Sequence, residues 1–365
     1  MPIFAFGSNI MGQLSQPDEL ICTDKPIELT EFRNKKVLKM ACGKMHTIIL
    51  CENNEIYSWG VNDDYALGRE GVEDEGIKLI EVPTKNKITD ICAGASFSAF
   101  LTEKGHVYTC GTFKSTNGIF GYNLTSKFGI GFAKIENLKG IVKISAGANH
   151  ILMLDKNGAI WSVGANESYQ LGRKHRLRRE KYILIPMIIS SNRSKEINYN
   201  FKEIEGGAFH SFAINTSNET FSWGSNCNGQ LGNGSLQPTD LKSKLPLENI
   251  DQIACGMNHT LIKTGDKKLY GCGENTQYQL GLQNVQIVAE PTFLLCGVEK
   301  VRAGGDFTVI QIANRLYSCG LNVESECGFS KKNEEIKSFT EIKHKFNKIV
   351  DFQCGGNFTL VQTEK

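Results

Sequence analysis

Short apolar runs separated by polar turns extend along the whole chain. Residues 47–50 form one such run, residues 51–54 are a mainly polar break, and residues 55–59 form the next run. Residues 151–161 repeat this arrangement around an Asn-Gly pair, which supplies the positive φ of a tight turn. No long stretch shows the 3.6-residue period of a helix. The pattern predicts an all-β protein made of short antiparallel strands.

A seven-fold repeat orders these strands. Each copy begins with a small residue, Gly, two variable residues and then His or Phe, and its glycine is Gly43, Gly94, Gly147, Gly207, Gly256, Gly304 or Gly355. A second element, aromatic-x-x-Gly, follows in the same register and ends at Gly7, Gly60, Gly111, Gly164, Gly224, Gly273 or Gly320. The period is about fifty residues, which is typical of propellers, solenoids and arrays.

The ends of the chain indicate that the array closes into a ring. Residues 3–7 supply a second element without a first, and residues 355–361 supply a first element without a second. Paired together, they complete one repeat, and radial stacking removes exposed strand edges. We therefore predict a seven-bladed β-propeller over residues 1–365, as one domain, with four antiparallel strands per blade. The N- and C-terminal strands pair in one blade.

Composition narrows the class of protein. The net charge is +2 and 40% of residues are hydrophobic, as in soluble globular proteins. No apolar run approaches the length of a membrane span and residues 1–3 lead directly into a strand, so neither a membrane span nor a signal peptide is expected. Several of the 12 cysteines, such as Cys110 and Cys255, occupy positions that other copies fill with Ala, Trp or Val. This usage indicates buried thiols in a reducing compartment.

No residue constellation predicts bond chemistry. Four copies place a histidine at one repeat position, namely His46, His150, His210 and His259, but the other three copies have Phe there. We therefore expect a structural role, with a hydrogen-bonded ring nitrogen. Phosphate-binding loops, nucleophile elbows, zinc-protease motifs and C-x-x-C pairs are absent from the sequence. No enzyme of ordinary type, no cofactor and no metal site is expected.

Three departures from the period are candidate functional features. The spacing from the second-element Gly to the turn Gly is 8 residues in five copies but 10 between Gly111 and Gly121. The extra residues predict a hairpin that protrudes from the rim and inserts into a partner; a tolerated loop insertion is the alternative. The copy after Gly147 is long and carries a basic run at residues 173–181, and residues 62–64 (Asn-Asp-Asp) form an acidic loop on the same rim.

Taken together, these motifs resemble the regulator of chromosome condensation family over essentially the whole chain. Residues 57–69 are similar to the family's second copy, residues 111–119 resemble its Phe-basic-x-Asn-Asn-Gly β-wedge, and residues 170–173 match a turn whose Arg faces a GTPase. The family's founding member is the exchange factor for the small GTPase Ran. The resemblance implies a wedge, pressed near the GTPase's phosphate-binding loop, that is made of Phe113, Lys114, Ser115, Thr116, Asn117 and Gly118. It implies supporting contacts from Asp63, Asp64, Asn149, Arg173 and Asn258.

The same resemblance implies a nuclear protein, with the cytoplasm as the alternative, and leaves nucleosome or DNA binding open. Asn149 and Asn258 stand where the founding member has functionally important Asp and His residues, so the charge at these two positions differs. A non-catalytic propeller that serves as a scaffold or adaptor is the alternative function. It would keep the regular eight-residue spacing. A light-sensing relative would need a cluster of tryptophans, and the chain has only Trp59, Trp161 and Trp223.

Overall fold

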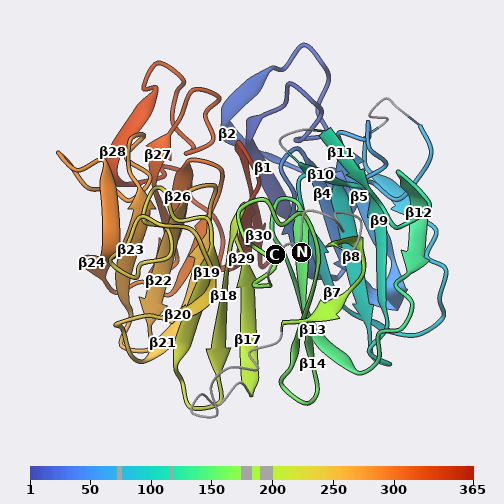
Figure 1. The fold of residues 1–365 in the computed structure, drawn as a ribbon. Helices are drawn as coiled ribbons and strands as arrows, with labels where there is room; N and C mark the ends of the chain where they lie inside the picture. The colour runs from blue at the N-terminus through green and yellow to red at the C-terminus, as the bar shows by residue number, and fades with distance from the viewer. Residues whose placement is uncertain (72–75, 116–117, 174–182, 190–199) are drawn as a thin grey trace.

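The described part of the chain forms seven four-stranded antiparallel sheets around a central axis, together with one two-stranded hairpin (Figure 1). The computed structural model describes residues 1–71, 76–115, 118–173, 183–189 and 200–365. Two short 3-10 helices, η1 (Thr30–Phe32) and η2 (Glu52–Asn54), lie between strands. The all-β, seven-bladed prediction is confirmed.

Six blades follow chain order from the axis outwards. Blade 1 consists of β3 (Val37–Cys42), β4 (His46–Cys51), β5 (Ile56–Gly60) and β6 (Lys78–Ile80), and blade 2 of β7 (Ile88–Ala93), β8 (Phe97–Thr102), β9 (Val107–Gly111) and β12 (Gly129–Lys134). Blade 3 consists of β13 (Ile141–Ala146), β14 (His150–Asp155), β15 (Ile160–Gly164) and β16 (Met187–Ile188), and blade 4 of β17 (Phe201–Gly206), β18 (His210–Asn215), β19 (Thr220–Gly224) and β20 (Thr239–Lys244). Blade 5 consists of β21 (Ile250–Cys255), β22 (His259–Thr264), β23 (Lys268–Glu274) and β24 (Ile287–Cys296), and blade 6 of β25 (Lys300–Ala303), β26 (Phe307–Ile312), β27 (Arg315–Leu321) and β28 (Glu335–Glu341).

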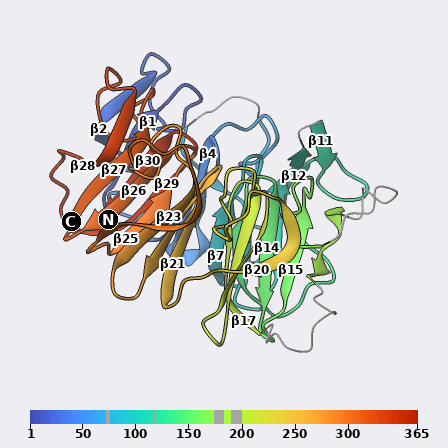
Figure 2. The same cartoon turned by 60° about the vertical axis from the view of Figure 1, so that its left-hand side comes forward.

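The seventh blade is built from both ends of the chain, as predicted. Its order from the axis is β29 (Ile349–Cys354), β30 (Phe358–Thr363), β1 (Ile3–Ser8) and β2 (Cys22–Glu28). Phe4 pairs with Val361 in the antiparallel register of β1 and β30. The chain ends consequently lie side by side in both ribbon views (Figures 1 and 2).

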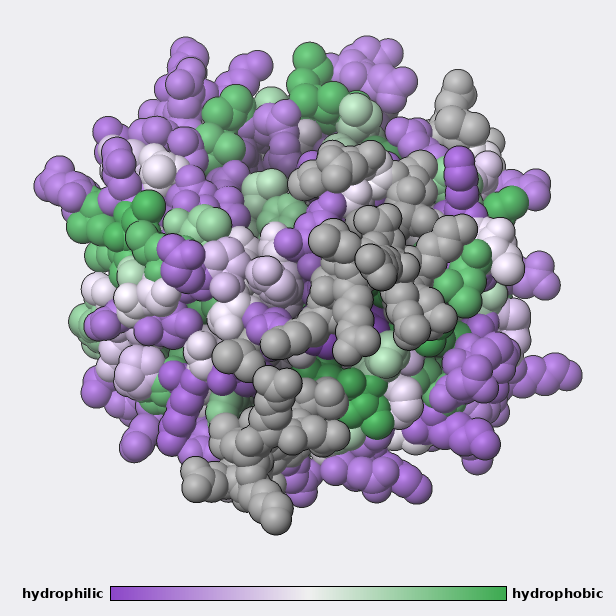
Figure 3. Space-filling view, in the orientation of Figure 1, coloured by the Kyte–Doolittle hydropathy of each residue, from purple (hydrophilic) through white to green (hydrophobic). Residues whose placement is uncertain are grey.

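The core lies between blades. Second strands such as β4, β14 and β18 are buried at every position because a neighbouring blade covers each face of the sheet. First strands such as β7 and β13 instead combine buried residues with partly or fully exposed ones, since one side of each strand faces the axis. On the face shown in Figure 3, hydrophilic residues predominate and hydrophobic residues form small separate groups.

Hydrogen bonds between blades explain two of the repeat's fixed positions. In four of the turns that follow a third strand, one carbonyl accepts two donors from the next blade. The Gln170 carbonyl accepts the Ser211 hydroxyl at 2.9 Å and the Trp223 indole N–H at 3.0 Å. The Gln230 carbonyl accepts the Thr260 hydroxyl at 2.9 Å and the Cys272 thiol at 3.7 Å. Trp and Cys can exchange at this position because both donate a hydrogen to the preceding blade, whereas Phe6 and Val163 fill it in the other two blades without donating.

The four repeat histidines belong to the same network. Their Nε2 atoms lie 2.9 to 3.2 Å from a hydroxyl of the next blade, in the pairs His46–Ser98, His150–Ser211, His210–Thr260 and His259–Thr308. Those hydroxyls already donate to turn carbonyls, so each histidine must donate from Nε2. The predicted structural role of the histidines is confirmed, and the ring that they brace is the frame for the surface loops.

Candidate functional site

The loops that follow the first and third strands of every blade emerge at the same end of the ring, which we call the loop face. Backbone hydrogen bonds fix this arrangement, since a residue at the end of the third strand, or just after it, donates to the residue before the repeat's His or Phe. Examples are Val61 to Met45, Ala165 to Asn149 and Glu274 to Asn258. The residues that precede His or Phe thus form a ring of seven on this face, namely Met45, Ser96, Asn149, Phe209, Asn258, Asp306 and Asn357.

The segment that breaks the period forms its own two-stranded sheet on the loop face. Strands β10 (Phe113–Ser115) and β11 (Gly118–Gly121) pair antiparallel, with Ser115 opposite Gly118. Figures 1 and 2 show this hairpin at the upper end of the ring, standing apart from the four-stranded sheet of its blade. The extra residues therefore build a separate structural element.

Phe113 anchors the base of the hairpin. Its side chain is 3% exposed and belongs to the hydrophobic core between blades 2 and 3. Its ring lies 4.9 Å, centroid to centroid, from the ring of Phe97 in β8. Phe113 therefore points into the ring and is not part of the accessible surface of the hairpin.

Lys114 ties the hairpin to the blades on both sides. Its backbone N–H donates to Asn149 Oδ1 at 3.2 Å, in the loop of blade 3. Its ammonium forms an ion pair with Asp64 in the loop of blade 1, where the Asp64 side chain is 13% exposed. Four of the residues singled out from the sequence, Phe113, Lys114, Asp64 and Asn149, are thus in one connected group.

At the start of β11, Gly118 lies beside open space. Gly118 is exposed, and a Cβ placed on it would meet no atom within 4 Å. Thr116 and Asn117 lie outside the described residues. Ser115 is partly exposed at the end of β10, and Asp63 is exposed beside Asp64. The structure therefore provides a fixed base with a projecting end.

Arg173 and Asn258 lie apart from this group. The guanidinium of Arg173 donates through Nη2 to the carbonyls of Ser162, Ile183 and Ile185 at 3.2 to 3.4 Å, so the side chain turns into its own blade. Burial lowers the pKa of Arg173 to about 10. Asn258 donates to Glu274 Oε2 at 3.0 Å on the loop of blade 5. The basic run that follows Arg173, at residues 174–181, lies outside the described residues.

Sequence reasoning missed an acidic region on the loop face. Asp306 occupies the same repeat position as Asn149 and Asn258, and burial together with the nearby charge of Glu274 raises its pKa. Next to it, Asn357 donates to Glu324 Oε2 at 2.5 Å. Comparing all seven copies at the position before His or Phe would have shown Asp306. Blades 5 and 6 therefore present carboxylates on the face that carries the hairpin.

The described residues of the loop face comprise a projecting hairpin, the contacts that anchor it and a group of carboxylates. The repeat histidines are buried and paired with the next blade, so they are not available at the face. Among the described residues, no group of three or more His, Cys, Asp or Glu side chains is arranged to hold a metal ion. In the same part of the chain, no helix is long and apolar enough to cross a membrane.

Comparisons with known proteins relate the chain to a single family. A family model described as RCC1-like domain matches residues 2–361. The regulator of chromosome condensation of Xenopus laevis is 26% identical, and the alignment covers 100% of this chain and 90% of that protein. The guanine nucleotide exchange factor SRM1 of Saccharomyces cerevisiae is 28% identical, with 89% of this chain and 78% of that protein covered.

Solved structures agree with the fold. The crystal structure of Prp20p from Saccharomyces cerevisiae, described with its binding properties to Gsp1p and histones, has a TM-score of 0.92 at 27% identity. It covers 98% of this chain and 90% of its own. Human WBSCR16 has a TM-score of 0.83 at 17% identity, which is evidence for the fold alone.

Proposed function

Because the chain belongs to the RCC1-like domain family, we propose that it is a guanine-nucleotide exchange factor for a Ran-like small GTPase, which docks on the loop face. The observation that carries the proposal is the β10–β11 hairpin, the element that interrupts the repeat and projects from that face. No bond is made or broken by this protein in such a role. Its work is to favour the nucleotide-free form of its partner.

A wedge can displace parts of another protein only if its own base stays fixed in position. Phe113 is packed in the core and Lys114 is held by Asn149 and Asp64. Moving the base would cost burial of an aromatic side chain, roughly 1.5–3 kcal/mol, in addition to these polar contacts. The strain of docking therefore falls on the GTPase. In this account Phe113, Lys114, Asp64 and Asn149 position the wedge, and Ser115 to Gly118 contact the partner.

The carboxylates of the loop face would contribute electrostatically. Glu274 lies close enough to Asp306 for its charge to help raise the pKa of Asp306. A nucleotide phosphate brought near this region would be repelled, whereas basic groups of a GTPase left without their phosphate would be attracted. Asp63 and Asn258 would add rim contacts, and Arg173 would act indirectly by fixing residues 183–185.

Reciprocity sets the thermodynamic requirement. If the factor binds the empty GTPase more tightly than the loaded one, it must weaken nucleotide binding by the same ratio. A release rate increased about 10⁵-fold corresponds to about 7 kcal/mol of lowered barrier. Contacts that form only as the nucleotide site opens must provide this energy, and a rigid projecting element is suited to make them.

The test is release of a fluorescent GDP analogue from purified Ran, with and without the protein. We expect strong acceleration by the unaltered chain and at least about a tenfold loss in the double variant Lys114→Ala, Asn117→Ala, because both the anchor and the tip are altered. Glu341→Gln, on the outer strand β28, is the control and should release nucleotide normally.

Two outcomes would separate the alternatives. Tight binding of Ran without faster release would support the scaffold function. Fast release that persists in the double variant would refute the wedge while leaving an exchange factor that works through another part of the loop face.

We extend the proposal to the nucleus and chromatin. The support is that relatives are named regulators of chromosome condensation and that Prp20p is described with histones. Co-sedimentation of the purified protein with reconstituted nucleosomes tests this extension, and absence of binding at low salt would contradict it.

A further inference from the structure

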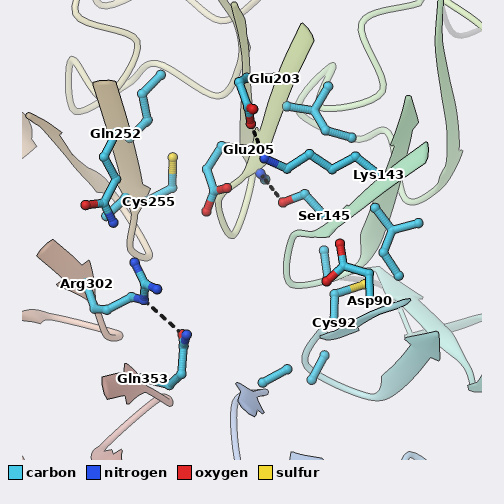
Figure 4. A pocket seen from close by; sticks show the side chains of 18 of the residues that line it. Asp90, Cys92, Lys143, Ser145, Glu203, Glu205, Gln252, Cys255, Arg302 and Gln353 are labelled. Atoms are coloured by element: carbon cyan, nitrogen blue, oxygen red, sulfur yellow. Dashed lines mark hydrogen bonds and ion pairs between the residues drawn. The ribbon is translucent and has the colours of Figure 1, made fainter. Parts of the chain in front are cut away.

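The first strands of the seven blades surround a central channel that the exchange function does not use. The side chains at four and at two residues before the repeat glycine line a cavity of about 640 Å³, except in blade 6, where Arg302 lines it and Lys300 does not. Figure 4 shows these side chains pointing toward a common open space. A cavity of this size accommodates a small organic molecule.

The ring of side chains at four residues before the glycine is charged but internally neutralised. Its members are Lys39, Asp90, Lys143, Glu203, Gln252, Lys300 and Asp351. Ion pairs join neighbouring blades as Lys39–Asp90, Lys143–Glu203 and Lys300–Asp351. Gln252 donates its amide to the carbonyl of Val301 at 2.8 Å. This ring is therefore satisfied by contacts within the protein.

The ring at two residues before the glycine is different. It consists of Ala41, Cys92, Ser145, Glu205, Ala254, Arg302 and Gln353. Arg302 is held by Gln353 Oε1 at 3.1 Å, the Val301 carbonyl at 3.1 Å and Asp351 at 3.4 Å. Among the described residues that line the channel, Glu205 is the ionisable carboxyl without a hydrogen bond or ion pair.

The surroundings of Glu205 leave its carboxylate short of a counter-charge. Figure 4 shows the carboxyl group directed into the open space, with Cys255 beside it and Arg302 across the channel. The charged groups that face it are Lys143, Arg302, Glu203 and Asp90, and burial raises the pKa of Glu205 to about 7. A cation brought to this position would satisfy the carboxylate, since Lys143 and Arg302 are already engaged in contacts of their own.

We propose that the central channel is a binding site for a small organic amine, whose ammonium group pairs with Glu205. An ammonium offers three donors to one carboxylate, and the alkyl part would lie in the channel against Ala254 of the neighbouring blade. A bare metal ion is disfavoured because it needs several oxygen or sulfur ligands, and the described residues provide no such group. An anion is disfavoured because the unsatisfied charge of the ring is negative.

The probe is putrescine, with butanediol as the neutral molecule of the same length. Isothermal titration and ligand-observed NMR should detect putrescine binding to the full chain, and butanediol should not bind. Glu205→Gln keeps the shape of the side chain and removes the charge, so we expect at least about tenfold weaker binding. Glu341→Gln removes a carboxylate from the exposed surface of β28 and should bind putrescine as the unaltered chain does.

The pH dependence provides a second test that needs no variant. Putrescine should bind about tenfold more tightly at pH 8 than at pH 6, because Glu205 must lose its proton to accept the ammonium group. The proposal is overturned if putrescine does not bind at millimolar concentration, if butanediol binds equally, if Glu205→Gln binds as tightly as the unaltered chain, or if affinity is independent of pH. Nucleotide release in the Glu205→Gln variant should be normal, which separates this proposal from the exchange function.

Discussion

Replacing His210 with phenylalanine should make the protein less sensitive to acid. His210 is fully buried and donates from Nε2 to Thr260 Oγ1 at 2.9 Å, while its Nδ1 has no partner among the described residues. Burial, aided by the nearby His259 and His150, lowers the pKa of His210 to about 3. Phenylalanine fits this position because Phe97, Phe307 and Phe358 occupy it in other blades.

The magnitude follows from proton linkage. An unfolded histidine takes up a proton near pH 6.5, whereas folded His210 does so only near pH 3. Between these values the unfolded chain binds more protons, so the free energy of unfolding falls as the pH falls, by up to about 1.4 kcal/mol per pH unit. Between pH 7 and pH 5 this one residue should remove about 2 kcal/mol of stability.

The order of stability of the variant and the unaltered protein should therefore reverse between pH 7 and pH 5. At pH 7 it lacks one buried hydrogen bond and should be less stable by about 1 kcal/mol. At pH 5 it avoids the proton penalty and should be more stable by about 1 kcal/mol. Glu205 and Glu326 have pKa values raised to about 7, so they stabilise the folded state as the pH falls, but both proteins carry them and the difference cancels.

Urea unfolding from pH 7 to pH 5, followed by tryptophan fluorescence and circular dichroism, measures this difference. Phe307→His is the reciprocal variant, since Thr359 of the next blade provides the matching hydroxyl, and its stability should fall more steeply with acid. Parallel pH curves for His210→Phe and the unaltered protein would refute the argument, because they would mean that His210 takes up its proton equally in both states.

Two further predictions concern the frame of the ring. Deleting residues 1–8 removes β1 and leaves β30 without its outer neighbour, so the truncated chain should aggregate in light-scattering measurements; a soluble truncation of full stability would contradict the closed ring. Gly94→Ala should lower the free energy of unfolding by about 1–3 kcal/mol because its Cβ would lie 2.1 Å from the Phe97 ring. Gly131→Ala, whose Cβ would meet only a carbonyl at 4.0 Å, is the matched control, and equal losses in both variants would exclude steric crowding as the cause.

The fold could be predicted from the sequence because each copy repeats the same local pattern of strands and turns. The strand-turn-strand pattern at residues 47–59 became β4 and β5, and the two extra residues before Gly121 became a separate hairpin. The orientation of individual side chains could not be predicted in the same way. The spacing between the repeat glycines shows which segment departs from the regular blade. The burial of Phe113, however, depends on the space beside Phe97, which belongs to another strand.

Arg173 and Glu205 illustrate the same limit. Arg173 resembles a rim contact in sequence, yet the carbonyls of Ile183 and Ile185 approach it only in the folded blade and draw it inwards. In the sequence, nothing distinguishes Glu205 from other polar strand residues. Its position in the channel becomes evident only when the seven first strands are placed around one axis. Aligning the copies at two and four residues before the repeat glycine would have shown both rings, because these positions line the channel in each blade, with Lys300 as the exception.

The pairing of β1 with β30 has a consequence for biosynthesis. As the chain leaves the ribosome, β1 emerges before every other strand, and its inner neighbour emerges after all the rest. Until then the nascent protein is an open arc, and the backbone donors and acceptors at one edge of β1 remain unpaired. They can form hydrogen bonds with an unpaired strand of another chain. Cells that make this protein should therefore need to shield the first strand during translation, and slow synthesis of the last blade should be the stage most prone to misassembly.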